Sequence, residues 1–199
     1  MAFPTVSAPY GLIPINRVDG MPYAGQLRQI PIASGFNAAI GFGSVLQLTN
    51  GYVNLITSGS NPGNIVGVCV GGSYTNSSGQ PVEAQYIPVG ASNPVAYVID
   101  DPMAQFKAAV VTSGTTVTTT GVTRGVVGCN MALVLNSVNT TTGNATTGIE
   151  YGTQDDASTL PVRVIDVVPQ TALASGNYVE LLVKINTNQY NNTTGNNAP

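Results

Sequence analysis

The sequence predicts an all-β protein, built as an antiparallel β-sandwich or a barrel-like domain. Short runs of Val, Ile, Leu, Thr and Tyr recur along the chain, and Gly, Pro, Asn or Ser separate them about every ten residues. One segment carries a complete hairpin pattern. Helical periodicity is weak: Pro102–Val111 is the one helix candidate, and its Pro102 and β-branched end favour a strand.

The segment SVLQLTNGYVNLIT, residues 44–57, predicts a β-hairpin. Its Asn50-Gly51 pair is typical of a two-residue type I′ turn. This turn fixes the register, because it pairs Leu48 with Val53 and Leu46 with Leu55 on one face, and Thr49 with Tyr52 and Gln47 with Asn54 on the other. Both strands alternate together, so we expect one buried and one wet face.

Further apolar runs predict the remaining strands, which are Leu27–Ile32, Ile65–Val70, Val82–Ile87, Val95–Ile99, Phe106–Thr112, Met131–Leu135, Val162–Val168 and Tyr178–Ile185. In the last run, alternation sends Val179, Leu181, Val183 and Ile185 to one face and Tyr178, Glu180 and Lys184 to the other. No repeat of fixed period is present. We therefore expect residues 25–186 to form a single β domain.

The two ends of the chain differ from this domain. Residues 1–24 contain Pro4, Pro9, Pro14 and Pro22 and lack strand alternation, which predicts an extended N-terminal arm. Its large apolar side chains need a surface to cover, either a neighbouring subunit or the protein's own sheet. The candidate interface residues are Phe3, Pro4, Tyr10, Leu12, Ile13, Pro14 and Tyr23. Residues 187–199 predict a polar, low-complexity C-terminal tail.

The composition argues against an enzyme. The 199 residues include no histidine, six Lys or Arg and nine Asp or Glu, while 43% of them are hydrophobic. Enzymes at neutral pH commonly use a histidine or an activated carboxylate, so we expect no catalytic residue and no enzyme. The net charge of −3 provides no basic surface for nucleic acid. A surface with few charges is weakly protected against association, which suits a subunit of an assembly.

Neither export nor membrane insertion is indicated. The first residues, MAFPTVSAPYGLIP, lack the basic and apolar regions of a signal peptide, and no apolar run is long enough to span a membrane as a helix. We therefore expect no membrane partner.

The remaining candidate sites favour structural roles. Cys69 and Cys129 lie in apolar runs and predict two buried reduced thiols, with a disulfide as the alternative. Two thiols without histidine exclude a standard zinc site. The acidic pairs Asp100-Asp101 and Asp155-Asp156 favour turns over a metal site. The threonine-rich stretch, residues 112–123, is typical of an edge or surface strand, with a ligand-contact face as the alternative. We expect neither a metal nor a cofactor.

Four segments, found in order over most of the chain, resemble virion structural proteins of tailed bacteriophages. They are APYGLIPIN, VIDDPMAQFK, GCNMALVLNSVNTTTGN and TLPVRVIDVVP with the following YVELLVKINTNQY. The likeness is greatest to capsid decoration (cement) proteins of short-tailed phages, including those of cyanobacteria. It implies a β-rich subunit on the outer surface of the capsid, bound to the major capsid protein and commonly assembled as a homotrimer.

The sequence therefore predicts a capsid decoration protein that acts by adhesion. A subunit of the tail or of a head fibre is one alternative, which copy number per virion would distinguish. A virion-surface module that binds glycans through Tyr and Asn side chains is another, although the chain has no Trp for sugar stacking.

Overall fold

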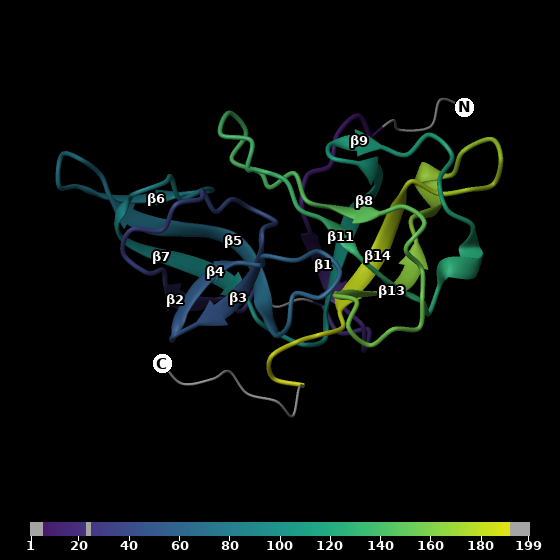
Figure 1. The fold of residues 1–199 in the computed structure, drawn as a ribbon, viewed down its shortest axis with the longest axis horizontal. Coiled ribbons are helices and arrows are strands. Elements are labelled where there is room, and N and C mark those ends of the chain that lie inside the picture. The colour runs from purple at the N-terminus through teal and green to yellow at the C-terminus, as the bar shows by residue number, and fades with distance from the viewer. Residues whose placement is uncertain (1–5, 23–24, 192–199) are drawn as a thin grey trace.

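The computed structural model describes residues 6–22 and 25–191, and it confirms the all-β prediction. Two β-sheets lie side by side, the six-stranded sheet on the left of Figure 1 and the eight-stranded sheet on the right. In the described ranges, the helical elements are two 3₁₀ turns, η1 (Arg124–Val126) and η2 (Pro169–Thr171). The predicted sandwich or barrel is thus realised as two packed sheets.

The six-stranded sheet is antiparallel and nearly closes on itself. Its order is β2 (Arg28–Pro31), β7 (Ser92–Ile99), β5 (Ile65–Thr75), β3 (Val45–Thr49) and β4 (Tyr52–Leu55), with β6 (Pro81–Ala84) paired to β5. A parallel bridge joins Ile32, just after β2, to Val53 of β4. The first and last strands of the sheet therefore meet, which gives it a barrel-like form.

The eight-stranded sheet is built around the long strand β8. Its order is β10 (Asn130–Met131), β13 (Val162–Val167), β14 (Glu180–Ile185), β8 (Ala104–Ser113), β12 (Gly148–Glu150) and β11 (Leu133–Val134), with β1 (Ile13–Arg17) and β9 (Thr116–Val117) also paired to β8. The pairing of β8 with β12 is parallel, an exception to the antiparallel prediction. The segment Pro102–Val111, the one helix candidate, lies mostly in strand β8, which confirms the preference for a strand.

The β3–β4 hairpin has the predicted register. Leu46 pairs with Leu55, Gln47 with Asn54, Leu48 with Val53 and Thr49 with Tyr52. Asn50 and Gly51 have φ values of 51° and 80°, as a type I′ turn requires. Leu46 and Val53 are buried, whereas Thr49 and Tyr52 are exposed, so the wet face is also confirmed.

Two hydrophobic cores share β5, which explains its continuous apolar run. Ile65 and Val68 pack in a core with Phe106 and Leu181 between the two sheets. Val66 and Cys69 face a second core, inside the barrel-like sheet, with Leu46, Val53 and Val98. A strand buried on both faces has no polar face to alternate with.

Several strand predictions need correction. The predicted strand Met131–Leu135 is divided into β10 and β11, and Val82–Ile87 ends at Ala84. Ile87 instead forms a bridge to Ile40 in a loop. Glu180 was expected on the face of its strand opposite Leu181 and Val183, and it is only 4% exposed there. The short strands β1 and β12 were not predicted, because proline and glycine hide their alternation, whereas β9 lies within the threonine-rich stretch that was expected to form an edge or surface strand.

The arm and the tail both continue into the fold. Within the predicted arm, β1 pairs with β8 and Leu12 is fully buried in the core between the sheets. Within the predicted tail, the Ile65 amide donates to the Thr187 carbonyl and the Gln189 amide donates to the Ile65 carbonyl, at 2.9 and 2.8 Å. Asn188 is buried as a result. The ordered β structure thus reaches beyond residues 25–186 at both ends.

Candidate interaction site

The N-terminal arm is fixed to both sheets through a close contact of two glycines. Gly11 and Gly43 have φ values of 80° and 82°, and a Cβ on Gly11 would lie 2.8 Å from the Gly43 carbonyl oxygen. The Leu12 amide donates to that same oxygen at 3.1 Å, and the Gly11 amide donates to the Thr147 carbonyl at 3.2 Å. Backbone can approach backbone this closely because neither glycine carries a side chain.

A partly buried polar cluster, Tyr10, Lys107 and Glu180, holds the arm from the side. The Tyr10 hydroxyl donates a hydrogen bond to Glu180 Oε1, and Lys107 Nζ lies 3.4 Å from the same oxygen. Lys107 Nζ also lies 5.5 Å from the centre of the Tyr10 ring. Burial, and then the neighbouring Glu180, raise the pKa of Tyr10 above its ordinary value. Tyr10 therefore stays protonated and remains a donor.

The predicted interface residues have different positions in the structure. Leu12 is covered by the protein's own core, and Tyr10, Ile13 and Pro14 are partly buried against β8 and Glu180. Phe3, Pro4 and Tyr23 lie outside the described residues. In the described part of the arm, the large apolar side chains that are exposed are Ile15, at a bulge in β1, and Met21, and the sequence reasoning missed both.

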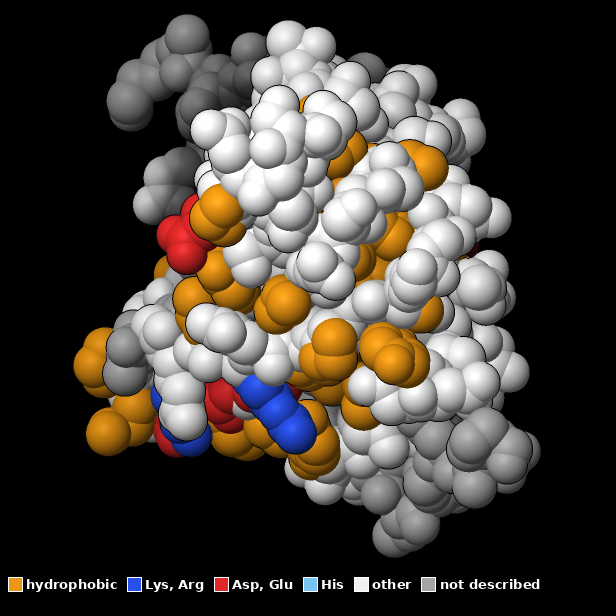
Figure 2. All heavy atoms as spheres, turned by 90° about the vertical axis from the view of Figure 1, so that its left-hand side faces the viewer, with side chains coloured by type: hydrophobic (Ala, Val, Ile, Leu, Met, Phe, Trp, Pro, Cys, Tyr) orange, Lys and Arg blue, Asp and Glu red, His pale blue; other side chains and the backbone are white. Residues whose placement is uncertain are grey.

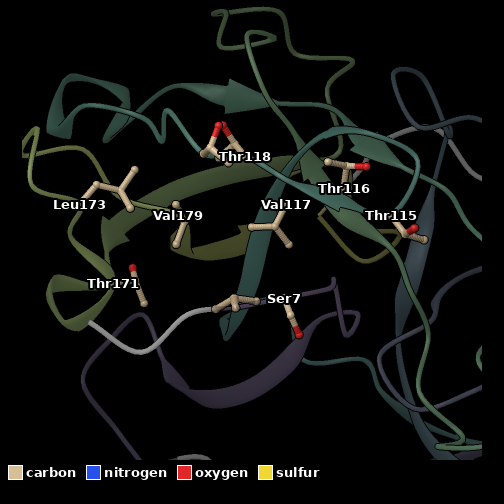
Figure 3. Close-up of a pocket in the computed structure, with 10 residues that line it drawn as sticks. Ser7, Thr115, Thr116, Val117, Thr118, Thr171, Leu173 and Val179 are labelled. Atoms are coloured by element: carbon tan, nitrogen blue, oxygen red, sulfur yellow. The ribbon is translucent and has the colours of Figure 1, made fainter. Parts of the chain in front are cut away.

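A groove lies where the arm passes the threonine-rich stretch. This threonine groove has a volume of about 420 Å³, and its lining includes Ser7, Thr116, Val117, Thr118, Leu173 and Val179. Figure 3 shows Ser7 from the arm on one side and Thr116, Val117 and Thr118 on the other. None of the lining residues is charged. The structure therefore brings two sequence candidates, the arm and residues 112–123, to one place.

The acidic pair Asp100-Asp101 joins the two sheets at a charged corner. Asp100 pairs with Arg28 of β2 at 3.3 Å and accepts a hydrogen bond from Tyr190 at 3.2 Å, while Asp101 pairs with Arg17 of β1 at 3.0 Å. Asp101 Oδ1 also accepts the Met103 amide at 2.8 Å, as the predicted turn requires. On the face that Figure 2 shows, most of the charged side chains gather in the lower left part. Each of the two carboxylates is therefore paired with an arginine side chain.

The second acidic pair also forms a turn. Asp155 Oδ1 accepts the amides of Asp156 and Ala157 at 2.6 and 3.2 Å. The hydrogen bond with the Asp156 side chain, followed by these amides, lowers the pKa of Asp155. Among the described residues, no group of three or more His, Cys, Asp or Glu side chains is placed to hold a metal ion.

The two cysteines are free thiols with different surroundings. Cys69 is buried in the barrel core, and burial raises the pKa of its thiol to about 12. Cys129 is partly exposed, which corrects the prediction that both thiols are buried. Its Sγ lies 4.0 Å from the carbonyl oxygen of Gly125 in the turn η1. The apolar run that follows it, Met131 to Leu133, is buried.

Comparison with known proteins gives no relative. No protein family model matches the chain, and no match was found among curated proteins or solved structures. In the described part of the chain, no helix has the length and hydrophobicity needed to cross a membrane.

Proposed function

We propose that this chain is a non-enzymatic capsid decoration protein that binds the outer surface of a tailed-phage head. The observation that carries the proposal is the threonine groove beside the N-terminal arm. Its lining combines Val117, Leu173 and Val179 with threonine hydroxyls and contains no charge. An uncharged, partly apolar surface loses little hydration energy when another protein covers it.

The mechanism is adhesion across capsomer junctions. A protein that binds the assembled shell and not the loose subunits stabilises the shell by mass action. The partner is the major capsid protein, and the resemblance to phage cement proteins favours a homotrimer located on the virion surface. The anchored arm supports this role, because Gly11, Leu12 and Tyr10 hold it in one conformation before binding and so reduce the entropy lost on contact.

The test uses the full chain, because removing residues 1–20 would take Leu12 out of the core. Val117→Asp and Leu173→Asp each place a charge in the threonine groove. Val89→Asp is the matched control, since Val89 is 59% exposed and lies in a loop of the other sheet. Purified phage heads that lack the protein are mixed with each variant, and the bound fraction is measured after sedimentation.

We expect the two groove variants to bind at least about tenfold more weakly than the wild type, while the control binds normally. Full occupancy by both groove variants would exclude the groove from the contact. Absence of binding by the wild-type protein would overturn the proposed function itself. Copy number per virion, measured on the same particles, separates decoration from a tail or head-fibre subunit.

A further inference from the structure

A second groove lies on the barrel-like sheet, far along the chain from the arm. This amide groove has a volume of about 570 Å³ and runs between the wet face of the β3–β4 hairpin and the loop that follows β2. Its rim is formed by Asn37, Gln47, Thr49, Asn54 and Thr57. Its floor is apolar, with Phe36, Ile40, Leu55 and Ile56. The groove therefore combines polar groups at its edge with hydrocarbon beneath them.

The polar groups of the rim are available to a ligand. Gln47 and Asn54 face each other in the hairpin register, so their amides lie on the same face as neighbours. In the described part of the chain, none of the five rim side chains makes a hydrogen bond. Each amide offers both donors and an acceptor, and each threonine hydroxyl can do either. The rim thus presents mixed donors and acceptors within one groove.

This arrangement matches the chemistry of a sugar. Every hydroxyl of a saccharide both donates and accepts, as the rim does, and the C–H face of a sugar ring suits an apolar floor. Tyr52 pairs with Thr49 at the tip of the hairpin and is 43% exposed. Its ring extends the wet face with an aromatic surface on which a sugar can stack.

The charge of the groove restricts the ligand further. None of the lining residues is charged, so an anionic or cationic group would lose hydration without gaining a counter-charge. An extended peptide fits less well, because its backbone requires a row of main-chain partners whereas this rim consists of side chains. We propose that the amide groove binds an uncharged saccharide. The proposal does not depend on capsid binding, which uses the other sheet.

The test measures sugar binding by the full-length protein. Saturation-transfer NMR and calorimetry are run with methyl glycosides of glucose, galactose, mannose and N-acetylglucosamine, followed by a glycan array. The double variant Gln47→Ala/Asn54→Ala removes the two facing amides. Because both residues lie on the wet face of the hairpin, neither hydrophobic core changes. Gln170→Ala is the matched control, because it removes an exposed amide from the turn η2, between β13 and β14 and away from the amide groove.

We expect millimolar binding of at least one uncharged sugar, a loss of about tenfold or more in the double variant, and no change in the control. Circular dichroism verifies that each variant is folded. The proposal is overturned if no sugar binds the wild-type protein, or if the folded double variant binds as the wild type does. Binding of sialylated glycans alone, or of peptides but no sugar, would also overturn it.

Discussion

Replacing Tyr10 by phenylalanine tests how the arm is held. The change removes one hydroxyl and keeps the ring, including its contact with the Lys107 ammonium. Glu180 is 4% exposed and would keep Lys107, at 3.4 Å, as its remaining side-chain partner in the described structure. A hydrogen bond to a charged group contributes about 1.5–3 kcal/mol. For a chain of this size, a loss of about 2 kcal/mol lowers the melting temperature by roughly 4–8 °C.

The assay is urea unfolding followed by circular dichroism, with Tyr52→Phe as the matched control. Tyr52 is exposed, and its hydroxyl has no partner among the described residues, so we expect a cost below about 0.5 kcal/mol. Hydrogen exchange should also accelerate at the amides of β1 in Tyr10→Phe. If Tyr10→Phe lowers the free energy of unfolding no more than Tyr52→Phe does, then the hydrogen bond from Tyr10 to Glu180 does not hold the arm.

Three further predictions follow from named contacts. Gly11→Ala should cost at least about 1 kcal/mol more in urea unfolding than Gly20→Ala, because both have φ near +80° but only Gly11 would place its Cβ 2.8 Å from the Gly43 oxygen; equal costs would contradict the contact. Ellman's reagent at mildly alkaline pH should label Cys129 in the native protein and both thiols after guanidinium unfolding, because the pKa of Cys69 is raised to about 12; rapid native labelling of two thiols would refute this. The raised pKa of Tyr10 means that the unfolded chain releases this proton near pH 10 while the folded chain retains it. Stability should therefore fall as the pH rises above about 10, and fall less steeply in Tyr10→Phe; identical slopes would contradict it.

Local sequence rules predicted the parts of the fold where one signal dominates. The Asn50-Gly51 turn and the alternation around it predicted every pair of the β3–β4 hairpin. The strand over residues 65–70 was predicted from its apolar run, but the reason for that run, burial between two cores, needed the three-dimensional structure. The strand β1 was missed because Pro14 and the bulge at Ile15 interrupt alternation, and its pairing to β8 is set by distant residues.

The sites were less predictable, because they depend on which distant residues meet. The sequence singled out the arm and the threonine-rich stretch separately, and nothing local indicated that Ser7 and Val117 line one groove. Alternation placed Glu180 on the face opposite Leu181, but nothing local indicated that the arm supplies Tyr10 as its partner there. Gln47 and Asn54 were predicted to be opposite each other, but the loop with Asn37 that completes the amide groove was not.

The sparse charge of this chain is used inside the molecule. Arg17 and Arg28 bind the acidic corner where the sheets join, Lys107 supports the arm, and Arg124 pairs with Asp166 at 2.8 Å, so four of the six basic residues have a carboxylate partner. Both grooves are left without charge. Any contact made there depends on hydroxyls, amides and apolar groups, whose interactions salt screens little. Most of the few basic groups are therefore paired within the molecule, and the uncharged grooves are the surfaces that we propose for binding.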